Sequence, residues 1–199
     1  MPRLGVELRT QRRQHVLTSA WRCFSRDGFH ATSMDDIIEA SGMSSSAVYR
    51  YFRSKDELID AAAEESLVLL RDFFARLLAT EPTPTLAETL TGLVDELSDR
   101  TANVDYDLSK VAMHAWAESL RRAELEARSR AFYLDVRGHL AELARRWQRA
   151  GQLPPDANPD DVAAVLLTMM PGLIVTHHLV GEVSARALVA GLAAIGSAS

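Results

Sequence analysis

Apolar residues recur at intervals of three and four along almost the whole chain, and this periodicity constrains the fold more than any other feature. Within residues 8–26 the apolar positions are Val16, Leu17, Ala20, Trp21, Cys23 and Phe24. Such spacing places the apolar side chains on one face of a helix. No segment shows the strict alternation of a half-buried strand. The sequence therefore predicts an all-α protein of about nine helices.

Capping residues and helix breakers divide the chain into these helices. Ser33 with Asp36, and Thr85 with Glu88, have the spacing of capping boxes. Asn158 followed by a proline is a strong helix start. We expect helices over residues 8–26, 34–40, 45–51, 55–79, 85–101, 108–121, 124–150, 159–180 and 184–195.

Composition predicts a cytoplasmic globular protein. Hydrophobic residues make up 47% and charged residues 25% of the 199 positions, which is ordinary globular usage. No apolar run reaches the roughly 18 residues of a membrane-spanning helix, and the N-terminus lacks the apolar segment of a secretory signal. The single cysteine, Cys23, agrees with a reducing compartment. We expect no membrane partner.

The net charge is distributed unevenly. Residues 1–56 hold nine basic and six acidic side chains, whereas residues 57–199 hold 13 basic and 21 acidic ones. The first segment is therefore positive (+3) and the remainder negative (−8), within a total of −5. A basic end on an acidic body is typical of a protein that presents one end to a polyanion.

Residues 32–55 have the pattern of a helix-turn-helix. Ile37, Ile38 and Ala40 would form the buried face of a first helix, Gly42 the turn, and Val48 with Tyr51 or Phe52 the anchor of a second helix. Small residues at the start of that second helix would let its backbone enter the DNA major groove closely. An ordinary helical hairpin fits the same apolar spacing.

Several polar residues around this segment suit contacts to a DNA backbone. Thr32 and Ser33 stand at a helix N-terminus, where free amides and hydroxyls can hold a phosphate. Tyr49, Tyr51 and Lys55 carry donors that could reach the backbone. The alternative for each is structural, with the tyrosines covering the core and the lysine solvated.

The segment resembles the N-terminal domain of the TetR/AcrR family of bacterial transcriptional regulators over residues 12–58. The resemblance is carried by Gly28-Phe29, Ala31-Thr32-Ser33, Ile37, Ala40, Ser41-Gly42, Ser44, Val48-Tyr49, Tyr51-Phe52 and residues 54–58. It implies a three-helix DNA-binding domain, residues 1–56, and a helical ligand-binding and dimerisation domain, residues 57–199. The DNA-binding residues it suggests, together with the polar residues above, are Thr32, Ser33, Ser44, Ser45, Ser46, Ala47, Tyr49, Arg50, Tyr51 and Lys55.

One departure from the family bears on specificity. Members often carry Lys, Arg or Gln where this chain has Ser45, and serine discriminates bases poorly. We therefore expect specificity to depend on groove shape, on water, or on an N-terminal arm that reaches the minor groove. The basic residues available to such an arm are Arg3, Arg9, Arg12 and Arg13.

Residues 57–199 are expected to contain a dimer interface and a ligand site. By resemblance, the two apolar C-terminal helices form the homodimer interface; the alternative is that both are simply core. Residues proposed to bind a hydrophobic or aromatic effector are Met113, His114, Trp116, Phe132, Tyr133 and Met170, although each could instead pack in the core. Asp135, His139 and Glu142 share a helix face, but such a row is usually solvated, and no metal or cofactor is expected.

The motifs of common enzyme classes are missing from the sequence. It contains no Gly-rich phosphate loop, G-x-S-x-G elbow, CxxC or HExxH. The sequence predicts a ligand-responsive transcriptional regulator, a repressor, that binds a near-palindromic double-stranded operator as a dimer and is released by a small-molecule effector. The alternative is a helical small-molecule-binding protein that does not bind DNA.

Overall fold

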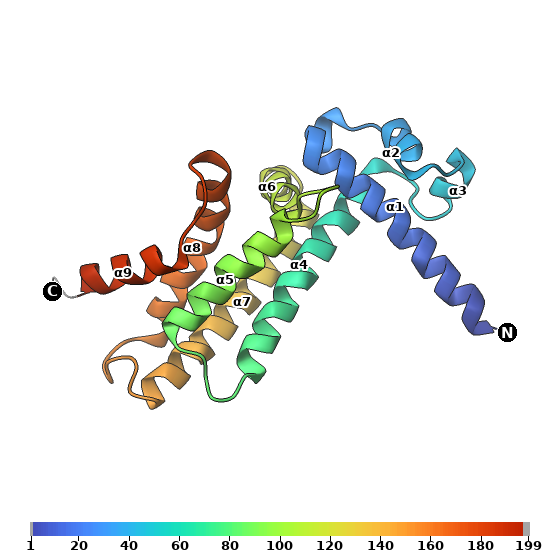
Figure 1. Cartoon of the computed structure of the whole chain (residues 1–199). Helices are drawn as coiled ribbons and strands as arrows, with labels where there is room; N and C mark the ends of the chain where they lie inside the picture. Colours follow the sequence, from blue (N-terminus) through green and yellow to red (C-terminus); the bar gives the residue numbers. More distant parts are fainter. Residues whose placement is uncertain (1, 197–199) are drawn as a thin grey trace. The chain divides into compact units, whose positions relative to one another are not determined.

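The computed structural model describes residues 2–196, with the side chains of residues 2–4, 66 and 69 excepted (Figure 1). All regular structure in that range is helical, which confirms the predicted fold class. The nine helices there are α1 (Pro2–Ala31), α2 (Met34–Ser41), α3 (Ser45–Tyr49), α4 (Lys55–Ala79), α5 (Leu86–Thr101), α6 (Leu108–Ser119), α7 (Ala123–Arg149), α8 (Pro159–Leu179) and α9 (Ala185–Gly196).

The predicted capping residues form the helix starts. The Asp36 amide donates to Ser33 Oγ at 3.1 Å, and the Ser33 amide donates to the Asp36 carboxylate at 2.7 Å. Thr85 and Glu88 make the same reciprocal pair at 3.2 and 2.7 Å. The Asn158 side chain caps α8. These bonds satisfy amides that have no partner within the helix, which is why the helices begin where they do.

The chain forms two compact units. The first contains residues up to 68 together with 100–126, and the second contains residues 69–99 together with 127 onward. The first unit therefore includes α6 as well as α1, α2, α3 and the first half of α4, because α6 packs on α1. The compact units divide the chain at positions other than residue 56. The boundary there between a DNA-binding domain and a ligand-binding domain stays a prediction.

The core of the first unit contains the apolar face predicted for its first helix. Its buried members are Val16, Leu17, Ala20, Trp21, Cys23, Phe24, Phe29, Ile37, Val48, Phe52, Leu58, Ile59, Ala62, Ala63, Leu108, Val111, Ala115 and Leu125. The prediction that Ala40 is buried is wrong. Helix α2 turns Ile37 and Ser41 inward, where the Ser41 carbonyl lies 2.7 Å from His15 Nε2, and Ala40 is exposed.

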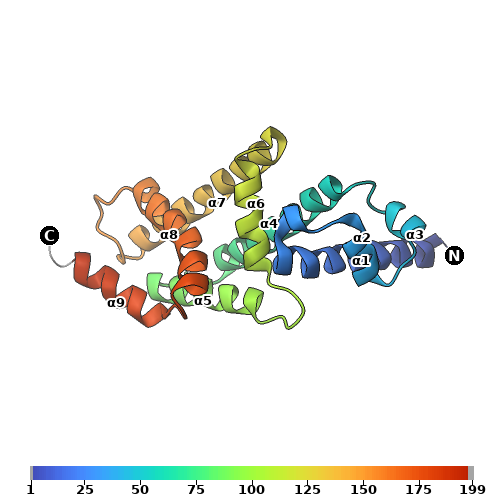
Figure 2. The same cartoon turned by 90° about the horizontal axis from the view of Figure 1, so that it is seen from above.

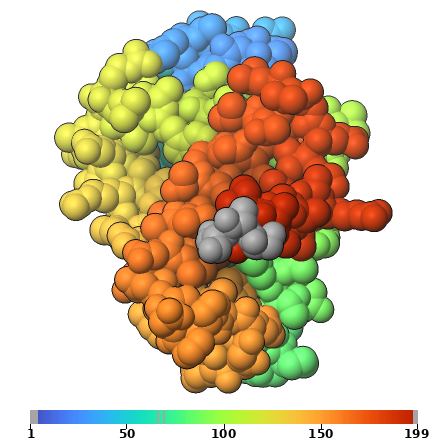
Figure 3. Space-filling model, turned by 90° about the vertical axis from the view of Figure 1, so that its left-hand side faces the viewer, coloured from blue at the N-terminus to red at the C-terminus, as the bar shows by residue number. Residues whose placement is uncertain are grey.

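The second unit leaves its C-terminal helices poorly covered. No described residue of α9 is buried, although nearly all of them are apolar. Helix α8 is long and apolar enough to cross a membrane by length and composition alone, and only 22% of its most apolar stretch is buried. Both helices lie at the surface in Figure 3, in orange and red. One copy of the chain thus exposes a large apolar surface here.

Candidate functional site

The turn between α2 and α3 depends on Gly42. Its backbone is left-handed (φ 63°, ψ 12°), and its N–H donates to the Glu39 carbonyl at 3.1 Å. Glycine adopts this conformation without the strain that a side chain would add. The next amide, that of Met43, donates to Ser41 Oγ at 3.1 Å. This turn joins α2 to α3 as the sequence predicted.

Helix α3 presents its serines to solvent. Val48 and Phe52 are fully buried and anchor the helix, while Tyr51 is partly buried against the same core. Ser44, Ser45 and Ser46 are exposed, and Ala47 is partly exposed. The helix is short, because it ends at Tyr49 rather than at residue 51. Base contacts by its first residues stay a prediction that this exposure supports.

The carboxylate of Asp36 lies at the N-terminus of α2 and accepts hydrogen bonds there. Thr32 is buried, and its hydroxyl donates to the Gly28 carbonyl at 2.8 Å. The Ser33 hydroxyl and amide both donate to the Asp36 carboxylate, and these bonds lower the pKa of Asp36. Its negative charge is stabilised at the helix N-terminus. The predicted phosphate contacts of Thr32 and Ser33 stay predictions.

Lys55 ties the start of α4 to the end of α1. Its ammonium donates to the Thr32 carbonyl at 3.0 Å and lies 3.5 Å from the His30 carbonyl. A cation is stabilised at carbonyls left open by a helix end. An ammonium has three donors, so Lys55 could also reach a phosphate. That second role stays a prediction.

The N-terminal arm is helical. Helix α1 begins at Pro2, six residues before the expected start, so Arg9, Arg12 and Arg13 lie on a helix rather than on an extended arm. The side chain of Arg3 lies outside the described residues. The Arg13 guanidinium packs 4.8 Å from the centre of the Phe52 ring. Arg9 and Arg12 instead line a groove with Arg50 and Tyr51.

Two other predicted DNA contacts lie on the exposed side of the same region. The Tyr49 side chain is 43% exposed, and Arg50, which follows the last residue of α3, is exposed as well. Both are accessible to a DNA backbone, while Tyr51 is half-buried. Their contacts with DNA stay predictions.

The residues predicted to bind an effector are divided between the two units. Met113, His114 and Trp116 are half-buried on α6 in the first unit. Phe132 and Tyr133 on α7 and Met170 on α8 belong to the second unit, where Phe132 and Met170 are buried. His114 packs on Phe29, with 5.7 Å between the ring centres. Their joint role in one ligand site stays a prediction.

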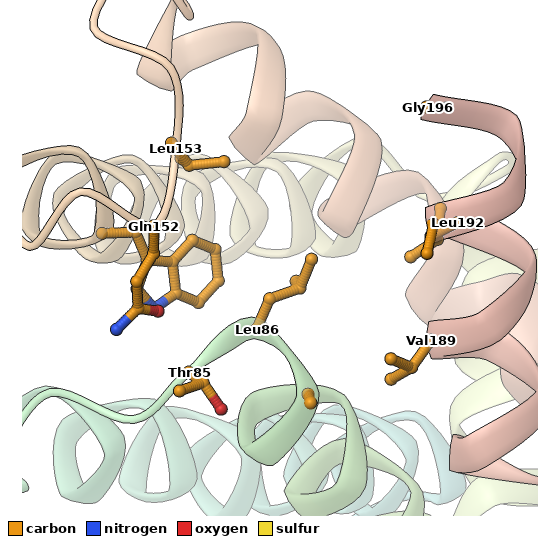
Figure 4. A pocket seen from close by; sticks show the side chains of 10 residues that line it. Thr85, Leu86, Gln152, Leu153, Val189, Leu192 and Gly196 are labelled. Carbon is orange, nitrogen blue, oxygen red and sulfur yellow. The ribbon is translucent and has the colours of Figure 1, made fainter. Parts of the chain in front are cut away.

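The second unit contains a cavity that sequence reasoning missed. It has a volume of about 540 Å³, and Figure 4 shows Leu86, Val189 and Leu192 directed toward it. Its lining comprises Thr85, Leu86, Ala87, Trp147, Gln152, Leu153, Val189, Leu192, Ala193 and Gly196. These residues come from the start of α5, the end of α7 with the following loop, and α9. Helical periodicity gives no signal for such a grouping of helix ends.

Comparison with known proteins gives matches along most of the chain. The model of bacterial regulatory proteins of the tetR family matches residues 16–62, and that of the C-terminal part of BetI-type transcriptional repressors matches residues 86–195. An uncharacterized HTH-type transcriptional regulator of Bacillus subtilis, YfiR, is 27% identical over 177 residues, which cover 87% of this chain and 83% of that protein.

Two solved structures share the fold and contain ligands. A transcriptional regulator from Saccharomonospora viridis, in complex with choline, aligns with a TM-score of 0.72 at 23% identity and covers 89% of this chain and 91% of its own. The complex of SmeT with triclosan aligns with a TM-score of 0.68 at 21% identity, covering 85% and 81%.

Proposed function

The chain belongs to the tetR family of bacterial regulatory proteins, and on that premise we propose that it is a repressor that binds a near-palindromic operator as a homodimer and leaves it when a small effector binds. The observation that carries the proposal is the helix-turn-helix, whose anchored second helix exposes Ser44, Ser45 and Ser46 on the basic part of the chain. The family consists of DNA-binding transcriptional regulators. Such a protein acts in the cytoplasm, where bacterial DNA lies.

The uncovered surface of α8 and α9 supports homodimer formation. Val165 is 54% exposed, Val180 84% and Ile195 73%. Large apolar side chains gathered at the surface mark an interaction site in a soluble protein. Two-fold pairing of these helices would bury the surface in both copies at once. The two DNA-binding domains of such a dimer, which we call heads (residues 1–56 of each copy), would contact half-sites one helical turn of DNA apart, roughly 34–36 Å.

The cavity beneath α9 supports an apolar effector. Its volume of about 540 Å³ falls within the range of about 300–1,000 Å³ of ligand pockets, and its walls are apolar apart from Thr85 and Gln152. We therefore propose a hydrophobic or aromatic compound as effector. The alternative location of the effector is among the residues predicted from sequence. Of these, Phe132, Tyr133 and Met170 belong to the same unit as the cavity.

Contacts at both ends of α4 suggest how a ligand could affect the DNA-binding head. The Arg146 guanidinium donates to the Leu78 carbonyl at 2.7 Å near the end of α4, and the next residue, Trp147, lines the cavity. At the other end, Lys55 donates to the Thr32 carbonyl. A ligand that shifts α7 would shift α4 and so change the separation of the two heads. Release requires the ligand to bind the released state more tightly, typically by about 1–3 kcal/mol.

DNA binding is tested with a duplex from the intergenic region upstream of the gene. Fluorescence anisotropy is measured for that duplex and for a scrambled one across a range of salt concentrations. We expect tighter binding to the natural duplex and a steep salt dependence, because phosphate contacts release counterions. Equal, weak binding to both duplexes, and to pooled genomic fragments, would favour the ligand-binding protein without DNA-binding activity.

Effector binding is tested by tryptophan fluorescence with a panel of apolar aromatic compounds. Trp147 lines the cavity, whereas Trp21 and Trp116 lie in the first unit. A variant that keeps only Trp147 should report quenching by a compound that also releases the operator. Release without a change in Trp147 emission would place the effector outside this cavity. An Ala87→Phe substitution on α5, away from the proposed dimer helices, should reduce the affinity at least tenfold by filling the space, while operator binding stays unchanged.

A further inference from the structure

The cavity beneath α9 has one polar side and one apolar side. Figure 4 shows Thr85 and Gln152 on one side of it, and Val189 and Leu192 on the other. The apolar side belongs to α9, which Figure 2 shows beside α5 in the same unit. A ligand in this cavity would therefore meet hydrogen-bonding side chains at one end only.

Two of the three polar side chains that line the cavity are already occupied by the protein. The Thr85 hydroxyl donates to the Glu88 carboxylate at 2.9 Å and accepts from the Glu88 amide at 3.2 Å. The Trp147 indole N–H donates to the Pro84 carbonyl. The third, the side-chain amide of Gln152, is exposed and makes no hydrogen bond with the residues that the structure describes. Its donor and its acceptor are thus available to a ligand.

The backbone holds Gln152 in place beside the cavity. The Gln152 N–H donates to the Trp147 carbonyl at 2.8 Å, and the preceding Gly151 has the left-handed backbone (φ 72°) that ends a helix. The side-chain nitrogen of Gln148 lies 2.7–3.2 Å from three carbonyls within residues 154–157, which fixes the following loop. A side chain on a fixed backbone loses less conformational entropy when it binds a ligand than one on a mobile loop does.

The cavity offers no counter-charge to an ionic ligand. Among the residues that the structure describes, no charged side chain lines it. The arginines at the end of α7 line a separate groove, where Arg149 pairs with Glu142 at 3.0 Å and Arg146 lies 3.6 Å from both Glu142 and Glu81. Moving a charged group out of water without an opposite charge is costly. The lining therefore favours an uncharged ligand.

We propose that the effector is an uncharged apolar compound with one hydrogen-bonding group, and that Gln152 is the residue that selects for this group. A glutamine amide has both N–H donors and a carbonyl acceptor, so it can pair with a carboxamide through two bonds and with a ketone or an alcohol through one. The apolar part of the compound would lie against Val189 and Leu192. This inference rests on the proposed function and narrows its effector from any hydrophobic or aromatic compound to this class.

Binding at this cavity is compatible with a dimer that forms through α9. The α9 residues that line the cavity are Val189, Leu192, Ala193 and Gly196. Residues at such intervals of three and four share one face of a helix. The opposite face, which includes Ala187 and Gly191, is exposed. A ligand and a second copy of the chain would therefore contact different faces of α9.

The test uses four probes that share one apolar frame: biphenyl, its 4-carboxamide, its 4-carboxylate and its 4-aminomethyl derivative, which is a cation at neutral pH. Isothermal titration calorimetry measures the affinity of each probe for the full chain. We expect the carboxamide to bind about threefold to tenfold more tightly than biphenyl, which is the gain that one net hydrogen bond gives. Both charged probes should bind more weakly than biphenyl, because nothing in the cavity replaces their hydration.

Substitutions of Gln152 test its role directly. Gln152→Leu should bind biphenyl and the carboxamide equally, because the amide is lost while the apolar space remains. Gln152→Glu should bind the cationic probe about tenfold more tightly than the wild type does, through a charge-assisted hydrogen bond. Gln11→Leu is the matched control, since Gln11 is an exposed glutamine on α1 in the first unit, and its loss should leave all four affinities unchanged. Circular dichroism checks the fold of each variant.

Three results would overturn this inference. Equal binding of biphenyl and the carboxamide by the wild type, or an unchanged preference in Gln152→Leu, would leave the cavity as a binding site but show that Gln152 does not select the ligand. Tighter binding of a charged probe by the wild type would identify another selecting group, such as Glu88 beside Thr85. No binding of any probe, with unchanged Trp147 emission, would remove the cavity as a site for this class of compound.

Failure of the proposed function is recognised by a separate measurement. Selective operator binding is measured on the same proteins without any probe, and Gln152→Leu should bind the operator as the wild type does. If the wild type shows no selective operator binding, the proposed repressor is refuted whatever the probes do. If operator binding is selective and the probe results are those above, only the choice of effector class fails.

Discussion

The imidazole of His114 on α6 lies directly over Gly28 near the end of α1. A Cβ atom added at residue 28 would sit 3.0 Å from His114 Cε1, and the Gly28 backbone has a φ of +79°. Glycine is required there for both reasons, since a side chain would overlap the ring and would strain the backbone. The contact holds α6 against the DNA-binding head within the first unit.

Replacing Gly28 by alanine should therefore destabilise the protein. We expect a loss of about 1–3 kcal/mol in the free energy of unfolding, from backbone strain and overlap with the ring. Urea denaturation followed by circular dichroism measures it. Gly138→Ala is the control, because Gly138 is exposed in the middle of α7 with nothing within 4 Å of the added atom. That variant should be neutral or slightly more stable; equal losses in both would contradict the role of the contact.

His114 should make stability depend on pH. Burial, with the nearby charges of His30 and Lys110, lowers the pKa of His114. The unfolded chain then takes up a proton at a higher pH than the folded chain does. Stability is therefore full above the ordinary histidine pKa and falls as the pH drops below it.

The measurement compares urea unfolding at pH 7.5 and pH 5.5 for the wild type and His114→Gln. Glutamine cannot titrate, so the variant should lose less stability on acidification than the wild type does. An identical loss in the two proteins would show that His114 does not determine the acid response.

Removing the ammonium of Lys55 should weaken the connection between α4 and the head. Its bond to the Thr32 carbonyl is a charge-assisted hydrogen bond at a half-buried position. We expect Lys55→Met to lose about 1–2 kcal/mol of stability. Salt titration of operator binding then separates the two roles of this residue, because a fall in slope of about 0.9 appears only if Lys55 also contacts a phosphate.

Charges placed on the C-terminal helices should prevent dimer formation. Val165→Glu combined with Ile195→Glu puts two carboxylates into the apolar surface of α8 and α9, which would be costly to bury in an interface. Sedimentation velocity should show a monomer whose circular dichroism is unchanged and whose operator affinity is strongly reduced. Leu120→Glu is the control, since Leu120, the residue that follows α6 in the other unit, is 86% exposed. A double variant that stays dimeric would place the interface elsewhere.

Much of the local structure could be predicted from sequence. The buried face of α1, the two capping boxes and the start of α8 at Asn158 agree with the structure because each depends on residues within about one helical turn. The boundaries of α4 agree for the same reason. The left-handed turn at Gly42 is likewise a local property of glycine.

The sites were harder to predict, since one residue can serve two purposes. The sequence predicts both a capping bond and a phosphate contact for Ser33, and the structure shows the capping bond to Asp36, while the phosphate contact stays a prediction. Similarly, His114 looked suitable for a ligand cavity, yet it packs against Gly28 and Phe29. Sequence identifies which residue types are available but not which partner each one takes.

The sequence by itself determined that this protein is helical, where its capped helices begin, and which segment resembles a DNA-binding domain. Those properties follow from contacts between residues three or four positions apart. Only the tertiary structure decided that α6 packs with α1 in the first unit, that Arg9, Arg12 and Arg50 share a groove, and that α5, α7 and α9 line one pocket. These groupings depend on how helices distant in sequence pack together, and the periodicity of a single helix carries no information about its neighbours.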